Sequence, residues 1–480
     1  MSAANLLILI PLLGVANVAS AAQPLTYREA LQASLDANPN LQRTALSTDQ
    51  AEAAFLSSQA IFDPTYNLSG SYTQATSTQF FGQLVQFQSQ IWRVNNDVSV
   101  TSPTGTTVSL GHSFGGSVFG GALGDETNFD SSVDMSVTQQ LLKGLSLRYN
   151  MENVTLSRRN WETAKLTQER TVQETLSQAG QAYWTWVYQS DLMAIANESV
   201  RVAEEALRVG MLKVQAGELA PVEQTRLEAA LVQAQANAID AKNSSDNAAN
   251  TLLLAMGQTP GKPIQPATDP GEVTDLALDE AAAVEVAMAQ NLEVLVAQAN
   301  LENAELQLRN ARHNRLPSLS ATATVGRQYP QAGSSSEAVS GVFGADGLPS
   351  STLSGNLSVP LLNRAARGNA RTQEASVSQT RITLDETRRS ITAQVEQQVR
   401  QLQSAQRRVE LADANQRLAE ETLAAKEALS DAGRAIQKDV LEARTEVERT
   451  RAEAAKSRTD YRMAQLELLR LQGQLSLDGA

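Results

Sequence analysis

The 480-residue chain contains no cysteine. Disulfide bonds, thiolate metal ligands, a cysteine nucleophile and an acylated N-terminal cysteine are therefore excluded. Aromatic residues are also scarce, at 4% of the chain, whereas alanine, glutamine, leucine and arginine crowd long stretches. This composition is typical of helical bundles rather than of a string of globular domains.

Motifs of catalysis and cofactor binding are missing as well. The sequence has no nucleophile elbow, no glycine-rich phosphate loop and no HExxH phrase. Its two histidines, His112 and His313, have no carboxylate cluster at metal-ligand spacing beside them. We therefore expect no enzyme activity, no cofactor and no metal site.

Basic residues are in deficit, because 39 Lys and Arg stand against 52 Asp and Glu and leave a net charge of −13. A nucleic-acid partner is not expected, since phosphates are bound by basic surfaces. An acidic chain is compatible with cations and with basic faces of partner proteins.

One hydrophobic run stands out, over residues 5–18, and it is too short to span a bilayer. Small residues follow at positions 19–22, so the sequence predicts a secretory signal peptide over residues 1–22, although no Lys or Arg precedes the run. No run of about 20 apolar residues comes later, and an ordinary transmembrane helix is therefore not expected.

The chain contains an internal repeat. Five residue types recur in order at an offset of about 251 residues. The first set is Leu25, Glu29, Ala30, Asn40 and Leu41, and the second is Leu276, Glu280, Ala281, Asn291 and Leu292. Each set begins a predicted helix that ends at a proline, Pro64 or Pro317. In the segment that follows, polar and apolar residues alternate with the period of two that is typical of a strand. Two copies of a helix, strand, strand, helix unit are predicted.

The predicted divisions of the chain follow from this repeat. The first repeat covers 23–257, with a β region at about 63–142 and a helical hairpin tip at about 216–221. A linker rich in proline and glycine at 258–275 joins it to the second repeat. That repeat covers 276–475, with a β region at about 317–362, a tip at about 432–437 and a tail at 476–480.

The helices are predicted to be long and to form coiled coils. The long ones run over about 143–217 and 363–433, near 70 residues or roughly 105 Å each. Glycine at each tip ends one helix, and the next begins at once. The last helix has a seam of every seventh residue, made of Val440, Val447, Ala454, Tyr461, Leu468 and Leu475. Helices with such a seam pack side by side.

With these features in place, the chain resembles the TolC family of outer-membrane efflux proteins over nearly its whole mature length. The resemblance is carried by the order and duplication of several phrases. These are Leu25 to Leu41, Gln140-Leu141-Leu142, Pro360-Leu361-Leu362, the glycine tips with Glu223 and Asp439 six residues on, and Leu252 to Gly257. Both tip phrases depart from the family's commoner Gly-Leu-Ser/Thr form.

The resemblance implies a mainly α protein with transmembrane β structure. Three chains would form a 12-strand outer-membrane β-barrel that continues into a long periplasmic α-helical coiled-coil barrel. Each chain is expected to supply four to six strands, and four from each of three chains agree with this count. Pooling strands closes the sheet and removes its edges, whose unpaired amides are costly in hydrocarbon.

The implied function is that of an outer-membrane channel subunit of a tripartite efflux or type I secretion system. It would export solutes or polypeptides across a Gram-negative type envelope. The implied partners are two further copies of the chain, a periplasmic adaptor protein, an inner-membrane pump of RND, ABC or MFS type, and outer-membrane lipid. A trimeric structural coiled coil or adhesin is the alternative, although adhesins usually anchor through C-terminal strands and this chain ends in a heptad helix.

Two acidic residues are candidates for a periplasmic gate. Asp439 and Glu442 begin the helix after the second tip, and threefold repetition would make a ring of carboxylates that prefers cations. The alternative is that Asp439 only stabilises the positive end of the helix dipole. For Glu223, the helix-start role is the favoured interpretation, because it follows Pro221 in the first turn.

The tips themselves are candidate adaptor-docking sites, at Gly217 and Leu219 in the first repeat and Gly433 and Ile436 in the second. The alternative for the apolar pair is packing within a closed tip.

The first β region also holds an insert. About 50 residues separate its matched strands, against about 25 in the second repeat, and the extra segment predicts a hairpin at about 91–114. We expect this hairpin to decorate the extracellular mouth rather than to widen the barrel.

Overall fold

The computed structural model of the protein describes residues 23–80, 84–121, 124–217, 219–271, 279–432, 434 and 437–477. The predicted signal peptide, residues 272–275 of the predicted linker and residues 276–278 at the start of the predicted second repeat lie outside these residues. The chain forms two compact units, and each draws on both halves of the sequence. Unit 1 holds Met1–Arg43, Arg170–Asn291 and Ser390–Ala480, and unit 2 holds Thr44–Glu169 and Leu292–Arg389.

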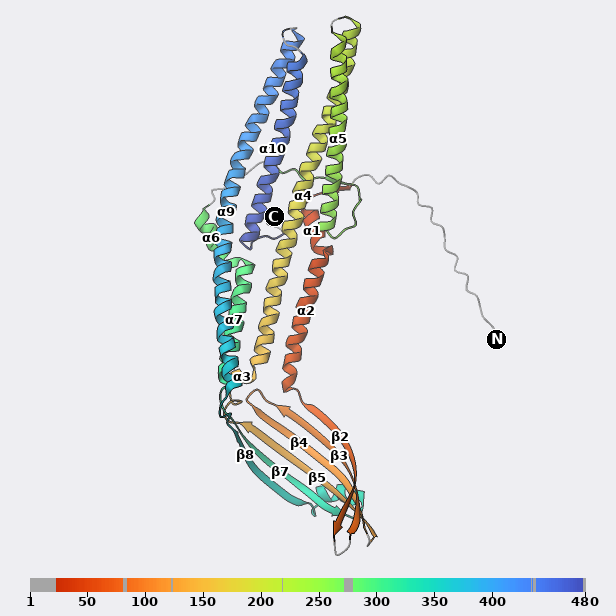
Figure 1. The fold of residues 1–480 in the computed structure, drawn as a ribbon, viewed down its shortest axis with the longest axis vertical. Helices are drawn as coiled ribbons and strands as arrows, with labels where there is room; N and C mark the ends of the chain where they lie inside the picture. The colour runs from red at the N-terminus through yellow and green to blue at the C-terminus, as the bar shows by residue number, and fades with distance from the viewer. Residues whose placement is uncertain are drawn as a thin grey trace, which may run out of the picture. The chain divides into compact units, whose positions relative to one another are not determined.

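Helices make up most of the described chain (Figure 1). They are α1 (Tyr27–Ala37), α2 (Pro39–Gln59), η1 (Ala60–Phe62), α3 (Leu147–Asn150), α4 (Glu152–Gln215), α5 (Pro221–Ala255), α6 (Glu280–Gln290), α7 (Leu292–His313), α8 (Ser335–Phe343), α9 (Arg364–Asp431) and α10 (Gln437–Leu471). The long helices α4 and α9 hold 64 and 68 residues, close to the predicted 70, and α5 and α10 hold 35 each. Within the described residues, no helix combines the length and hydrophobicity needed to cross a bilayer.

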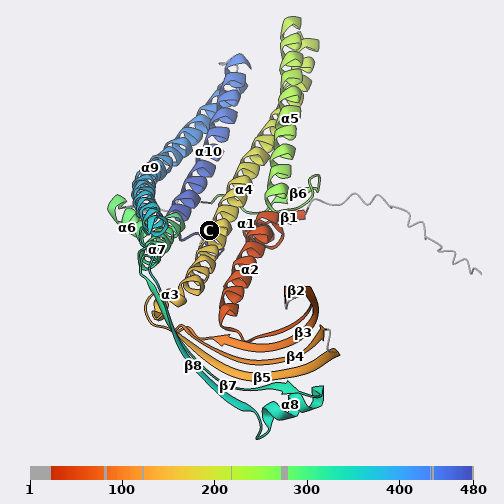
Figure 2. The ribbon, with the colours of Figure 1, turned by 60° about the horizontal axis from the view of Figure 1, so that its bottom comes forward.

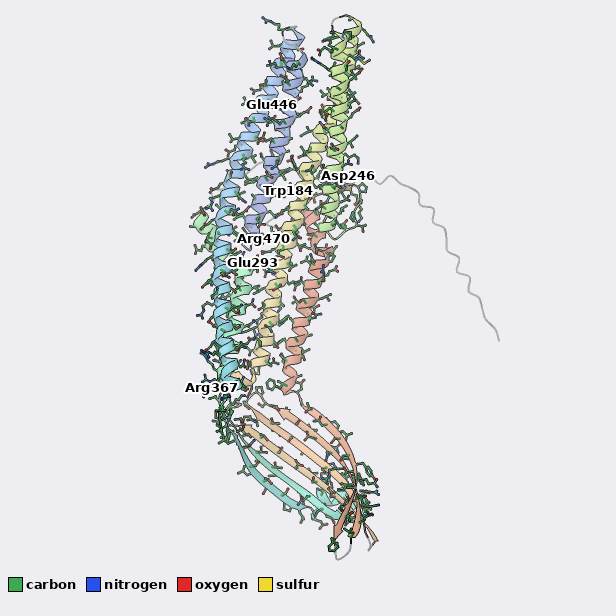
Figure 3. The ribbon with its side chains drawn as sticks, viewed as in Figure 1. Trp184, Asp246, Glu293, Arg367, Glu446 and Arg470 are labelled. Atoms are coloured by element: carbon green, nitrogen blue, oxygen red, sulfur yellow. The ribbon has the colours of Figure 1, made fainter. Side chains whose placement is uncertain are left out.

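Unit 1 is built around an aromatic cluster on α4. Tyr183, Trp184 and Trp186 are buried there, and Figure 3 labels Trp184. The hydroxyl of Tyr183 donates to the carbonyl oxygen of Leu25 at 3.0 Å, which ties α4 to β1 (Gln23–Leu25). β1 pairs in parallel with β6 (Ile264–Pro266). Because the buried hydroxyl is satisfied, the ring can lie in the core without an unpaired polar group.

A contact between the end of a short helix and the end of a hairpin helix, called the joint, occurs twice in unit 1. At the end of α1, the side-chain amide of Asn38 donates to the carbonyl oxygen of Ala255 at 3.1 Å. At the end of α6, Asn291 donates to Leu471 in the same way at 2.8 Å. The equivalent asparagines are 253 residues apart, two more than the offset read from the sequence, and Pro64 and Pro317 have this same separation.

Unit 2 contains one antiparallel sheet of six strands in the order β2-β3-β4-β5-β7-β8. The strands are β2 (Thr65–Phe80), β3 (Leu84–Thr101), β4 (Thr106–Gly121), β5 (Gly124–Gln140), β7 (Ser318–Ala332) and β8 (Leu348–Ser358). Figure 2 shows them side by side in a single curved sheet. The strands therefore come from both predicted repeats, with β5 paired to β7 across the junction.

The predicted role of the inserted hairpin is wrong. Its segment forms β3 and β4, which pair with β2 and β5 along most of their length. The insert is therefore part of the sheet rather than a decoration, and each chain supplies six strands instead of the four assumed in the count of twelve. The physical reason is that β3 and β4 satisfy their backbone groups on both sides only inside the sheet.

The two faces of the sheet differ in polarity, because side chains alternate along each strand and the register aligns them across strands. One face, called the apolar face, is mostly apolar and carries Tyr66, Leu68, Tyr72, Val94, Val98, Leu110, Phe114, Val133, Met135, Val137, Ala321, Ala323, Val325, Leu353 and Leu357, together with the polar residues Asn96, His112, Ser131 and Arg327. The other, called the polar face, carries Ser69, Ser71, Arg93, Asn95, Asp97, Ser99, Ser109, Ser113, Asp130, Ser132, Asp134, Ser136, Thr322, Thr324, Thr352, Ser354 and Asn356. All six strands contribute to both faces.

The connection between β7 and β8 contains the short helix α8. Its N-cap, Ser334, accepts a hydrogen bond from the amide of Glu337. α8 packs on β4, β5 and β7, and its own residues Ala338 and Val342 are fully buried. It therefore covers part of the apolar face, which the sequence interpretation did not anticipate.

Candidate functional site

The first helical hairpin of unit 1 ends in a tip between α4 and α5. Gly217 has a left-handed backbone with φ of 77°, and its amide donates to the carbonyl oxygen of Val214 at 3.0 Å. No atom lies within 4 Å of where its Cβ would stand. Leu219 is half-buried, and its amide donates to Lys213 at 3.3 Å. Gly217 is thus exposed at the surface, whereas Leu219 is partly covered.

Glu223 lies one turn into α5, after Pro221 at the helix start. Its carboxylate accepts from the guanidinium of Arg226 at 3.0 Å. A carboxylate in the first turn interacts favourably with the helix dipole. An ion pair between residues three positions apart adds a small local stabilisation. These contacts agree with a helix-start role for Glu223.

The second hairpin, α9 and α10, ends in a tip that is described only in part. Gly433 and Ile436 lie outside the described residues. The amide of Arg434 donates to the carbonyl oxygen of Leu429 at 2.8 Å and satisfies one of the last carbonyls of α9. α10 then begins at Gln437.

Asp439 and Glu442 lie three residues apart at the start of α10, which places them on one side of the helix. Asp439 is half-buried and Glu442 is exposed. Glu442 pairs with Lys438 at 3.4 Å, where both side chains are about two-thirds exposed, so water screens this pair strongly. The geometry brings the two acids together, and it is compatible with both the ring and the helix-dipole interpretation.

Sequence reasoning missed a ladder of ion pairs that joins α10 to α9. Three arginines of α10, seven residues apart, each reach a carboxylate of α9, and these acids are also seven residues apart. The pairs are Arg444 with Glu427 at 2.7 Å, Arg451 with Glu420 at 2.9 Å, and Arg458 with Asp413 at 2.9 Å. We call these three pairs the arginine ladder. A signal was present, since each arginine follows a seam residue by four positions.

The carboxyl of Glu420 is the most constrained acid of the arginine ladder. The side-chain amide of Gln416 donates to it at 3.2 Å, and Arg451 donates two further hydrogen bonds, at 2.9 and 3.0 Å. The pKa of Glu420 lies below its ordinary value because of the hydrogen bond from Gln416 first and that from Arg451 second. It is therefore a charged group at neutral pH.

The polar face of the sheet is a second candidate functional surface. Arg93 pairs with Asp130 at 3.3 Å and donates to the hydroxyl of Ser113 at 3.3 Å. Asp97 and Asp134 lie on the same face. Hydroxyl side chains surround these charges, so the face can line a water-filled passage. Among the residues that the structure describes, no group of three or more His, Asp or Glu could hold a metal ion.

Comparisons with known proteins place these features in context. The chain matches the family model described as outer membrane efflux protein over residues 30–258 and 283–474. No significant match to a curated protein sequence was found.

Several solved structures have a similar fold. The CmeC outer membrane channel of Campylobacter jejuni is 13% identical, with a TM-score of 0.68 over 93% of this chain and 85% of that chain. The outer membrane protein VceC of Vibrio cholerae is 14% identical, with a TM-score of 0.67 over 93% of this chain and 96% of that chain. The open state of the Neisseria gonorrhoeae MtrE outer membrane channel is 14% identical, with a TM-score of 0.65 over 95% of this chain and 90% of that chain. At these identities the likeness concerns the fold alone.

Proposed function

Because the chain belongs to the outer membrane efflux protein family, we propose that three copies of it form a duct through which a tripartite system exports its cargo. The family makes the chain an outer-membrane channel subunit with a helical extension in the periplasm. The trimeric state, the partners and the cargo are the proposal.

One observation carries the proposal: a sheet with an apolar and a polar face, and helical hairpins that end in tips, belong to one chain. A sheet of this kind suits lipid on one side and water on the other. Its two edge strands cannot stay unpaired in hydrocarbon, where no water satisfies their amides. Further copies of the chain are the simplest source of the missing partners.

The tips are proposed to dock a periplasmic adaptor protein, which connects the duct to an inner-membrane pump of RND, ABC or MFS type. Gly217 supports this, because it is exposed and no atom lies within 4 Å of the position that a Cβ would occupy. Leu219, Gly433 and Ile436 are proposed to take part in the same contact. The excess of acid in the chain favours a basic adaptor face.

Asp439 and Glu442 are proposed to form the periplasmic gate. In a trimer, both positions would repeat around one axis, and the resulting six carboxylates would favour cations in a narrow entrance. The exposure of Glu442 and the shared helix side of the two acids support this assignment.

The cargo is proposed to be solutes or polypeptides delivered by the pump, in an efflux system or in type I secretion. Among the described side chains, the polar face offers hydroxyl groups beside the charged residues Arg93, Asp97, Asp130 and Asp134. Such a lining conducts cargo without selecting one compound.

Fractionation of a Gram-negative host that produces the full chain tests the proposal. We expect the protein in detergent extracts of the outer membrane, migrating on an unheated gel at about three times the mass of the heated chain. The heated sample is the matched control. Recovery as a soluble periplasmic monomer would reject both the membrane location and the trimer.

A further inference from the structure

We propose that the sheet closes as a cylinder of eighteen strands, six from each of three copies, in which β8 of one copy pairs with β2 of the next. This inference rests on the proposed trimer and adds how the copies join and how wide the outer opening is. The occupant of each sheet edge is thus a second copy of this chain.

The edge strands have little of the protection that isolated sheets usually have, because they carry no charged side chain and Pro349 near the start of β8 is their one proline. Soluble sheets guard their edge strands with charged residues, which prevent pairing with other chains. The 16 residues of β2 and the 11 residues of β8 include no Asp, Glu, Lys or Arg. Leu68 on β2 and Leu353 on β8 are 64% and 82% exposed on the apolar face. Two uncharged edge strands with exposed leucines are suited to pairing with a strand of another copy.

The strand directions match without a break. Every neighbouring pair in the sheet is antiparallel, and the number of strands is even, so β2 and β8 run in opposite directions. When β8 of one copy lies beside β2 of the next, this pair is antiparallel as well. An odd number of strands would force one parallel pair into each junction.

The inserted strands β3 and β4 belong to this wall, because they have the same two faces as their neighbours. Val98 and Leu110 are partners in register on the apolar face, between Tyr66 of β2 and Met135 of β5. On the polar face, the hydroxyls of Ser109 on β4 and Ser136 on β5 are 2.6 Å apart. A hairpin outside the membrane wall would not need a continuous apolar face.

The consequence is a wider outer opening. The diameter of a closed sheet grows roughly linearly with strand number, so eighteen strands make a cylinder about half again as wide as twelve. The proposed lining is the polar face, with Arg93, Asp97, Asp130 and Asp134 repeated in each copy. This opening would pass bulkier cargo than a 12-strand one.

Cysteine pairs test the junction cleanly, because the chain has no cysteine of its own. Ser71→Cys on β2 is combined with Ser350→Cys, Thr352→Cys, Ser354→Cys or Asn356→Cys on the polar face of β8. Four strands separate these edges within one chain, roughly 24 Å, so a disulfide must join two copies. We expect covalent dimers and trimers, and nothing larger, for at least one of the four pairs. The matched control, Ser71→Cys with Leu353→Cys on the apolar face, should stay unlinked.

Two pairs within one chain test whether β3 and β4 lie in the wall of the membrane-embedded protein. Ser109→Cys with Ser136→Cys should form a disulfide, since these residues face each other on β4 and β5. Ser69→Cys with Ser132→Cys should not, because β3 and β4 lie between β2 and β5. If the hairpin left the sheet, the second pair would become adjacent and link.

The outcomes separate the two proposals. Linking of Ser69→Cys with Ser132→Cys in a trimer would overturn the eighteen-strand cylinder and leave the export channel intact. Failure of all four edge pairs in a trimer would overturn the β8 to β2 junction. A monomer in the outer membrane would contradict the proposed function itself.

Discussion

At the scale of single residues, two glycines hold the repeated joint of unit 1. Gly257 and Gly473 both have left-handed backbones, with φ of 70° and 69°. In each case the amide of the next residue donates to a carbonyl five positions back, which ends α5 and α10 in the same way. A Cβ at either glycine would lie 2.3 Å from a backbone oxygen, that of Ala37 or Gln290. Only glycine fits this joint.

Gly473→Ala is therefore expected to destabilise the protein by about 2–4 kcal/mol per chain, from left-handed strain and from the clash with Gln290. Gly217→Ala is the matched control, because its φ is 77° and the space around it is open. It should cost only the strain, about 1–2 kcal/mol. Thermal melting of the detergent-solubilised protein measures both, and equal shifts would refute the role of the close contact.

The proposed gate depends on the charges of two single residues, Asp439 and Glu442. The double variant Asp439→Asn and Glu442→Gln should reduce cation selectivity in planar-bilayer recordings, since it removes six charges from a trimer. Glu446→Gln is the control, because this acid lies further along the same helix (Figure 3) and pairs more closely, with Arg449 at 2.6 Å. Unchanged selectivity in the double variant would leave Asp439 with the helix-dipole role alone.

At the scale of elements, the hairpin of α9 and α10 combines an apolar seam with the arginine ladder. Val440 and Val447 are buried in the seam, and the ladder runs beside it at the same period of seven. Partly exposed pairs contribute about 0.2–1 kcal/mol each, so the seam supplies most of the stability and the ladder favours one register.

Arg451→Gln should lower the melting temperature at pH 7, and the difference from the parent should shrink at acid pH. The pKa of Glu420 is lower in the folded protein than its ordinary value of 4.5. Its stabilising contribution is therefore complete above pH 4.5 and is lost as the pH falls through the lowered pKa. Melting curves between pH 3 and 7 check this. A difference that does not change with pH would show that the pair is not electrostatic.

Much of the helical structure could be predicted from the sequence, because the signals that set the lengths and ends of helices are local. The glycines at the hairpin tips predict helix lengths close to those observed for α4 and α9. α8 was missed although Ser334 and Glu337 form a capping signal ahead of an apolar run.

Strand partners could not be predicted in the same way. The alternation in β3 and β4 indicates strands, but it does not say whether they pair with β2 and β5, since pairing joins distant segments. The two-residue error in the repeat offset has a similar cause. Matching residue types aligned Asn40 with Asn291. The hydrogen bond from the side-chain amide to the end of a hairpin helix, however, makes Asn38 the equivalent of Asn291. The tip at Gly433 and Ile436 stays a sequence prediction.

At the scale of the whole molecule, removal of the insert should change the width of the opening without preventing assembly. Deletion of residues 84–121 joins β2 to β5 and leaves four strands, which is still an even number. We expect a trimer with a narrower closed sheet, because the edges β2 and β8 are unchanged. Unheated gels report the trimer. As a control, deletion of residues 102–121 removes β4 alone and leaves an odd number of strands, so it should abolish the trimer.

The most direct test is electron cryomicroscopy of the full-length protein extracted from the outer membrane. We expect three copies around one axis and a single closed sheet of eighteen strands, with β8 of each copy beside β2 of the next. Three separate open sheets, or a closed ring of twelve strands with residues 84–121 outside it, would contradict this arrangement.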